Sequence, residues 1–234
     1  MQFLKIDEEL EPQISNRFNA RITREYVGGK RVLDVGCWSG NFVSLIRNFE
    51  SNIYGLDIEK QAVRAAKKRF PELKFICGSA LCMPFSSGSF DVVTCWDVIE
   101  HLPKSCEGKC LLEINRVLKN NGVLFLSTLN SNPLGKLLDL AYFFGHRHYS
   151  EEALRKLFQH SGFRVDKVYY TTGITTMLDG IVFLVFKHLL RRKKARLDFI
   201  ERVKEKEFSG ELKSRASLFR FHFILRKIRE VVER

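Results

Sequence analysis

The chain has 234 residues, 45% of them hydrophobic, so it can form one domain with a full core but not two large ones. Residues 1–13 include several acids and no long apolar run, which argues against a signal peptide or a membrane span there. The formal net charge is +12, and residues 187–234 contribute +9 of it, since they hold 16 Lys and Arg against 7 Asp and Glu. We therefore expect one cytoplasmic domain over residues 1–234, with its basic character near the C-terminus.

Cysteine usage fits a reducing compartment. Six cysteines are scattered along the chain: Cys37, Cys77, Cys82, Cys95, Cys106 and Cys110. The first two and the fourth fall in or beside elements that we expect to be buried, where a thiol behaves as a small apolar group. The last two have the spacing of half a metal site, but no second pair or histidine cluster follows. We expect free thiols and no metal site.

The chain begins with a helical segment, residues 1–30. Within it, residues 12–26 carry apolar side chains at helical spacing with arginines between them, which predicts an amphipathic helix. Such a helix can cover a sheet edge.

From residue 31 on, short apolar runs alternate with amphipathic segments. The predicted strands are residues 31–35, 52–57, 73–77, 91–95 and 122–128, and the predicted helices are residues 41–48, 60–69 and 105–118. Strands that alternate with helices form a parallel sheet with right-handed crossovers. Ligands of such sheets bind beyond the carboxyl ends of the strands.

The second half of the chain continues less regularly. Residues 130–144 predict a loop and a short helix over the site, and Ser150 and Gly162 predict the caps of a helix over residues 151–160. Residues 163–170 and 218–225 have strand patterns, and residues 228–234 predict a short helical end.

Residues 173–217 form an insertion between the last two predicted strands. Its apolar run, residues 178–190, is too short to cross a bilayer, and RRKKAR follows at residues 191–196. Beyond these basic residues we expect a charged helical stretch that reaches Glu207.

The turn after the first strand predicts a site for a nucleotide-like ligand. Gly36 and Gly40 leave backbone amides bare at a helix N-terminus. Trp38 and Asn41 stand where a dinucleotide fingerprint has its second and third glycines, which argues against a nicotinamide cofactor. Asp57 follows the loop by about 20 residues, where a carboxylate accepts hydrogen bonds from ribose hydroxyls. Spacing alone thus predicts a doubly wound nucleotide-binding protein.

Four segments in order carry a family resemblance: VLDVGCWSG at residues 32–40, GLDIEKQAV at 55–63, GSALCMPFSSGSFDVVTCWDVIEHL at 78–102 and EINRVLKNNGVLFLST at 113–128. Over about residues 31–163 the chain resembles class I methyltransferases that use S-adenosylmethionine (SAM), in particular the group with ubiquinone and menaquinone biosynthesis enzymes. The resemblance implies an α/β fold with a doubly wound, mostly parallel seven-stranded sheet. It also implies an antiparallel last strand with a helical insertion before it, and SAM as the cofactor.

The resemblance also implies the residues that contact the cofactor. They are Asp34, Gly36, Cys37, Gly40, Asp57, Ile58, Ser79, Ala80, Leu81 and Trp96. Asp57 would hold the ribose, and Asp34 would order the loop and the amino-acid end of the cofactor. The chain departs from the family at Trp38, where a glycine is usual, and at Ser79, where an acid usually contacts the adenine amino group. Adenine recognition then falls to backbone groups or to Ala80 and Leu81.

Methyl transfer needs alignment, exclusion of water and, for a hydroxyl or acidic carbon acceptor, one base. His101 is the first candidate for that base, because its turn opens on the cleft and imidazole titrates near neutral pH. The alternative is a histidine that only ties the turn together. Glu100 would orient His101 or contact substrate, and His146 and His148 are further candidates or ordinary loop histidines.

The insertion bears on the acceptor. An apolar run followed by basic residues suits an interface with anionic lipid, and this favours a lipid-like acceptor such as a quinone precursor. The alternative is a core helix with a solvated charged face, and nucleic acid ranks third as a partner. We therefore predict a SAM-dependent methyltransferase for a small-molecule or lipid-like acceptor, cytoplasmic and with or without membrane attachment. The rival hypotheses are a SAM-binding regulatory module without turnover, which Trp38 and Ser79 make credible, and an RNA methyltransferase.

Overall fold

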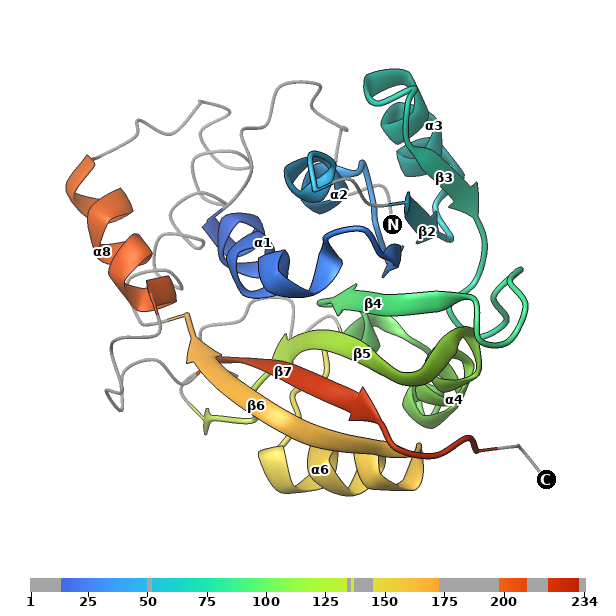
Figure 1. Cartoon of the computed structure of the whole chain (residues 1–234). Coiled ribbons are helices and arrows are strands. Elements are labelled where there is room, and N and C mark those ends of the chain that lie inside the picture. Colours follow the sequence, from blue (N-terminus) through green and yellow to red (C-terminus); the bar gives the residue numbers. More distant parts are fainter. Residues whose placement is uncertain are drawn as a thin grey trace.

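A central sheet with helices on both faces organises the chain (Figure 1). In the computed structural model, the described residues are 14–49, 52–133, 136, 145–172, 198–209 and 219–231. Over this part of the chain the sheet has seven strands in the order β3-β2-β1-β4-β5-β7-β6. The strands are β1 (Arg31–Val35), β2 (Asn52–Asp57), β3 (Lys74–Cys77), β4 (Phe90–Trp96), β5 (Leu118–Leu129), β6 (Phe163–Thr171) and β7 (Arg220–Lys227).

The strand directions confirm the predicted fold class. Neighbours from β3 to β5 pair in parallel, whereas β7 runs antiparallel to both β5 and β6. The order reverses between β1 and β4, so the carboxyl ends of these two strands mark the switch point at which ligands of open α/β sheets bind.

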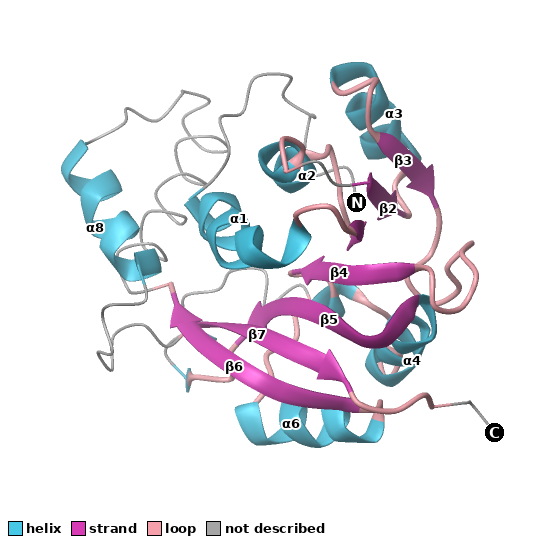
Figure 2. Cartoon of the chain, in the orientation of Figure 1, coloured by secondary structure: helices cyan, strands magenta, loops and turns pink. Residues whose placement is uncertain are grey.

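Helices cover the two faces of the sheet (Figure 2). They are α1 (Ile14–Val27), α2 (Asn41–Ile46), α3 (Lys60–Arg69), α4 (Glu107–Val117), α6 (Glu151–His160) and α8 (Asp198–Ser209), with a short 3-10 helix η1 (Ile99–His101) after β4. The first three lie over one face, and α4 and α6 lie over the other (Figure 1). Helix α8 lies beside α1, where Arg21 Nη2 donates to the Phe208 carbonyl at 3.0 Å.

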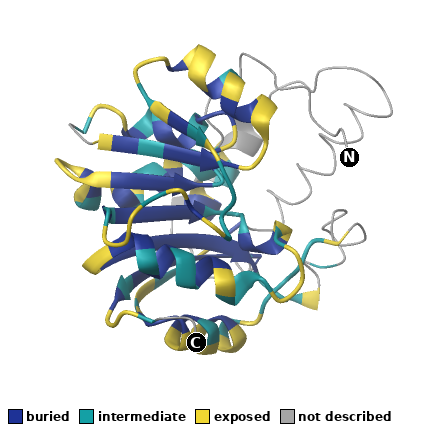
Figure 3. Ribbon diagram, turned by 90° about the vertical axis from the view of Figure 1, so that its right-hand side faces the viewer, coloured by how far each residue is buried: buried dark blue, intermediate teal, exposed yellow. Residues whose placement is uncertain are grey.

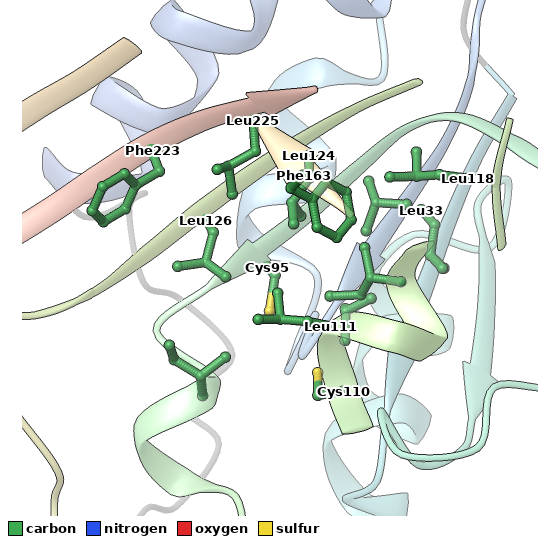
Figure 4. Packing of buried hydrophobic residues seen from close by; sticks show 14 of the residues in the cluster. Leu33, Cys95, Cys110, Leu111, Leu118, Leu124, Leu126, Phe163, Phe223 and Leu225 are labelled. Carbon is green, nitrogen blue, oxygen red and sulfur yellow. The ribbon is translucent and has the colours of Figure 1, made fainter. Parts of the chain in front are cut away.

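The strands of the sheet are largely buried (Figure 3), and an apolar layer lies on each face of the sheet. On β1, Val32 packs with the α1 to α3 layer, whereas Leu33 packs with the α4 and α6 layer. Figure 4 shows the second layer, where Leu111 of α4 lies below Leu124 and Leu126 of β5. Burial on both faces explains why these strands read as continuous apolar runs.

Local signals predicted several elements to the residue. β1, β2, α3 and α6 have the predicted bounds, and the Ser150 hydroxyl accepts from the Ala153 amide, as an N-cap should. The C-cap is Ser161 and not the predicted Gly162, which follows it with φ of +80°. Helix α8 agrees with the charged helical stretch expected near Glu207.

Two predictions at the C-terminus need correction. Strand β7 is shifted by two residues from the predicted 218–225, because Arg220 is its first residue to pair with Leu129 and Thr171. Residues 228–231 form no helix, and the Ile228 amide instead donates to the Gly162 carbonyl at 3.0 Å.

Other expectations fall outside the described residues. These are the apolar and basic runs at residues 178–196 and most of the predicted roof at residues 130–144. Among the described helices, none combines the length and the apolar character that crossing a membrane requires.

Candidate functional site

The turn between β1 and α2 brings backbone amides to the carboxyl end of the sheet. Gly36 and Gly40 have φ of +76° and +80°, and a Cβ on Gly36 would lie 2.3 Å from Val98 Cγ2. Only glycine fits at that position. Trp38 has φ of +47°, which is uncommon for a bulky residue, and its side chain is 40% exposed. Cys37 beside it is buried.

Asp57 ties this turn to the end of β2. Its Oδ2 accepts the Trp38 amide at 2.8 Å, and its Oδ1 accepts the Glu59 amide, also at 2.8 Å. Each carboxylate oxygen can accept a second hydrogen bond, so both can still receive ligand hydroxyls. Ile58, the next residue, is 73% exposed.

Asp34 lies inside the sheet below the turn. It is buried, and the Thr94 hydroxyl donates to its Oδ1 at 2.7 Å. Burial raises the pKa of Asp34 to about 7, the Thr94 hydrogen bond opposes this shift, and the charge of Asp57 adds to it. The neighbouring charge also couples Asp34 to the carboxylate proposed for the ribose.

The loop after β3 carries the predicted adenine-binding residues Ser79, Ala80 and Leu81. The Gly78 amide donates to the Asp57 carbonyl at 2.9 Å, and the Leu81 amide donates to Ser79 Oγ at 3.1 Å. These bonds place the loop beside the end of β2.

Two residues of α4 hold the far part of the same loop. Glu113 Oε2 accepts the Met83 amide at 2.7 Å, and Arg116 donates to the carbonyls of Phe85 and Met83 at 2.7 and 3.1 Å. Sequence reasoning missed this anchor, although the i, i+3 spacing of Glu113 and Arg116 was a possible signal.

Two acids of the turn after β4 bind neighbouring residues of β5. Ser127 Oγ donates to Asp97 Oδ1 at 2.7 Å, and Thr128 Oγ1 donates to Glu100 Oε2 at 3.0 Å. Successive side chains of a strand point to opposite faces, so the two acids are held on different sides of the sheet. Asp97 also pairs with Arg220 at 2.7 Å, a partner that the sequence did not predict.

Glu100 is 2% exposed. Burial, followed by the charge of Asp97, raises its pKa to about 8, so it holds a proton at neutral pH. Trp96 lies nearby on the other face, in ring contact with Phe42 at 5.4 Å and with His222 at 6.0 Å.

Two of the three histidine candidates meet at the end of η1. His101 is exposed and lies against His146, with ring centroids 4.5 Å apart. His148 is directed elsewhere, since its Nδ1 lies 2.9 Å from the Asn130 carbonyl oxygen. The structure therefore brings His101 together with His146, whereas Glu100 turns into the core.

The predicted cofactor residues come from the carboxyl ends of four neighbouring strands. Backbone bonds join β1 to β2 and β2 to β3, since Gly36 and Cys37 both donate to the Leu56 carbonyl and Gly78 donates to Asp57. Trp96 ends β4, which pairs with β1. This set lies at one edge of the sheet.

The cysteines form no disulfide. All six are free, as predicted; Cys95 and Cys110 are buried, whereas Cys77 is exposed at the end of the edge strand β3, contrary to the burial expected there. Among the described residues, no group of three or more His, Cys, Asp or Glu side chains could hold a metal ion.

Comparisons with known proteins agree on this region. Residues 33–126 match a family model described as a methyltransferase domain. A ubiquinone biosynthesis O-methyltransferase of Thiobacillus denitrificans is 31% identical over 125 residues, which are 50% of this chain and 51% of that protein. An uncharacterized protein of Methanocaldococcus jannaschii is 40% identical over 105 residues, 45% of this chain and 43% of that protein. The alignments thus span about half the length of these relatives.

Solved structures extend the likeness to nearly the whole fold. A SAM-dependent methyltransferase of Archaeoglobus fulgidus superposes with a TM-score of 0.66 at 18% identity, covering 93% of this chain and 95% of that chain. One from Methanosarcina mazei gives a TM-score of 0.64 at 19% identity, covering 88% and 97%.

Proposed function

We propose that the chain transfers a methyl group from SAM to an acceptor, because residues 33–126 match a model of the methyltransferase domain and the fold superposes on SAM-dependent methyltransferases. The observation that carries the proposal is the pairing of Asp57 with the glycine turn after β1. It combines a carboxylate for ribose hydroxyls with amides that no Cβ covers.

The residues of the turn fit the cofactor. Asp57 would accept the ribose hydroxyls, and Gly36 and Gly40 would allow the amino-acid end to approach the backbone. Trp38 replaces the usual glycine, yet its amide is directed to Asp57 and its indole is partly exposed, which agrees with a side chain that leaves the turn accessible. When bound, SAM supplies an activated methyl group on a sulfonium.

We assign the chemistry of the acceptor to the η1 turn. His101 would take the proton from an acceptor hydroxyl, which accelerates such a step by about 10²- to 10⁴-fold. Glu100 is held by Thr128 inside the protein, so we assign it to positioning of the turn rather than to contact with substrate. Trp96 would form a wall of the site.

For the acceptor we propose a small-molecule or lipid-like compound, with a quinone precursor as the leading choice. The ubiquinone biosynthesis O-methyltransferases among the relatives support this choice. The net charge of +12, concentrated towards the C-terminus, supports a role for an anionic membrane surface in presenting a lipid-like acceptor. Binding of the protein to anionic vesicles tests this role. We expect binding that high salt abolishes and that is lost when the basic residues 191–194 are neutralised. Equal binding by the neutralised variant would refute the role.

The cofactor test compares two carboxylates at opposite ends of the parallel strands, Asp57 at the carboxyl end of β2 and Asp91 near the amino end of β4. Asp57→Ala should lose detectable SAM binding in calorimetry. The control, Asp91→Ala, removes a carboxylate that accepts the Arg31 amide and pairs with Lys119, so it should disturb folding similarly but retain SAM affinity. Equal SAM affinity for wild type and Asp57→Ala would contradict the proposed site.

Turnover is tested separately with SAM labelled in its methyl group. Transfer of label into an extracted lipid or metabolite pool is expected for the enzyme. SAM binding without transfer into any pool would instead favour a regulatory module without turnover.

A further inference from the structure

We propose that His101 and His146 act as a pair, in which the His146 ring stabilises the imidazolium that forms when His101 takes a proton from the acceptor. The chemical role rests on the proposed methyl transfer. The pairing itself can be measured in protein that has neither cofactor nor acceptor.

The two rings come from separate parts of the chain. His101 ends η1 after β4, and His146 precedes α6. Their centroids lie 4.5 Å apart and their planes meet at 72°, so the edge of one ring faces the other. In this arrangement a protonated imidazole gains from the electrons of a neutral ring, whereas two protonated rings repel each other.

A polar network fixes the approach of the two segments. Arg147 Nη2 donates to the Ile99 carbonyl at 2.8 Å. The Tyr149 hydroxyl lies 3.1 Å from the same carbonyl and 2.9 Å from Glu107 Oε1, and it donates to one of them at a time. Arg147 Nε lies 2.9 Å from the same Glu107 oxygen. The neighbour of His146 and the turn that carries His101 are therefore held together.

Two charged residues of the network that holds the pair are opposite in sign, since Glu107 of α4 and Arg147 form an ion pair at 2.9 Å. Glu100 of the same turn carries a proton at neutral pH because it is buried. Burial raises the pKa of Tyr149, which keeps its hydroxyl neutral.

The pair indicates the class of acceptor. A lone pair of a His101 ring nitrogen would take the proton of an acidic O–H, such as a phenol or an enol. The oxygen's electrons form the new bond to the methyl carbon, and the electrons of the broken carbon–sulfur bond remain on sulfur as a neutral thioether. The imidazolium later releases its proton to water. His146 is then a positioning residue that acts through His101, and the acceptor is an acidic hydroxyl.

NMR titration of the His101 ring in the unliganded protein tests the pairing. In wild type, His101 should titrate in two steps, because the second proton enters a pair that already holds one. His146→Phe keeps an aromatic face and should give one step. His146→Ala removes the face and should give one step with a pKa about half a unit lower than in His146→Phe. His148→Ala is the matched control and should leave the two-step curve intact.

Two further readouts separate the possible outcomes. If methyl transfer is found, the lower pKa in the pH profile of kcat/KM should be about half a unit lower in His146→Ala than in His146→Phe. Tyr149→Phe loosens the network, so it should lower this pKa as well. A single step with one pKa in wild type, His146→Phe and His146→Ala would overturn the pair. That result would leave SAM binding untouched, whereas absence of methyl transfer would leave the titration standing.

Discussion

Asp34 and Glu100 are acids that the fold buries, and each receives one hydroxyl donor from a neighbouring strand. Thr94 serves the first and Thr128 the second. These hydrogen bonds do not replace the hydration that a buried carboxylate loses, so both residues favour their protonated forms. Their protons stay with the protein where exposed acids have already lost theirs.

The raised pKa of Asp34 makes the stability of the protein depend on pH. This pKa is about 7 in the folded protein, whereas the ordinary value for an aspartate is 3.8. Between these values the folded state binds more protons than the unfolded state, so the free energy of unfolding decreases as pH rises, by up to about 1.4 kcal/mol per pH unit. Asp34→Asn should remove this part of the slope, measured by urea unfolding of protein without cofactor from pH 4 to 8.

The hydroxyl donor gives a counter-test in the other direction. Thr94→Val removes the bond that lowers the pKa of Asp34, so the decline in stability should continue to higher pH than in wild type. Parallel curves for wild type, Asp34→Asn and Thr94→Val would show that Asp34 ionises alike in both states.

At the scale of elements, α4 acts as a support for the loop after β3. Glu113 and Arg116 lie one turn apart and bind three backbone groups of that loop, while their side chains pair at 2.7 Å. The arginine fork reaches two carbonyls and a carboxylate at once, which a lysine cannot do.

Arg116→Lys should therefore loosen the loop that carries Ser79, Ala80 and Leu81. We expect faster amide hydrogen exchange at residues 79–85 and a three- to tenfold weaker SAM affinity, consistent with the loss of about 1 kcal/mol of binding energy. Arg155→Lys on α6 is the control, since Arg155 pairs with Glu151 at the surface and lies away from the loop. Equal amide exchange rates at residues 79–85 in the two variants would show that Arg116 does not hold this loop in place.

Elements with strong local signals were predicted best. The Ser150 cap and the alternation of apolar and charged residues determined α6, and bounded apolar runs determined β1 and β2. The start of β7 was misplaced by two residues because Leu218 and Phe219 continue the strand pattern in sequence, whereas pairing with β5 and β6 begins at Arg220. In that region tertiary pairing, not periodicity, fixes the boundary.

At the scale of the whole molecule, the sequence predicted the sheet class and the family resemblance, and both are confirmed. The meeting of Asp57 with the turn after β1 also followed, because carboxyl ends of parallel neighbours share one edge. Contacts between distant side chains did not follow. Arg220 with Asp97 and Arg147 with Glu107 join residues far apart in sequence, and no periodic pattern marks them.

Another such contact joins the end of β7 to the end of α4. Lys227 is 3% exposed, and its Nζ donates to the carbonyls of Asn115 and Leu118 at 2.8 and 3.0 Å, at the C-terminal end of α4. Asn115 Nδ2 in turn donates to the Ser161 and Arg229 carbonyls, both at 3.0 Å. One lysine and one amide thus join α4, the end of α6 and the end of β7.

Lys227→Met should keep the volume of the side chain and leave two buried carbonyls without their donor. At about 1–3 kcal/mol for an unsatisfied buried group, the loss should lower the melting temperature by roughly 2–12 °C for a protein of this size. Lys156→Met, which removes a surface lysine paired with Glu152, should change it by about 1 °C. Because Asn115 belongs to the same network, adding Asn115→Ala to Lys227→Met should destabilise the protein by less than the sum of the single changes. If the destabilisations measured by calorimetry are fully additive, Lys227 and Asn115 stabilise the protein independently.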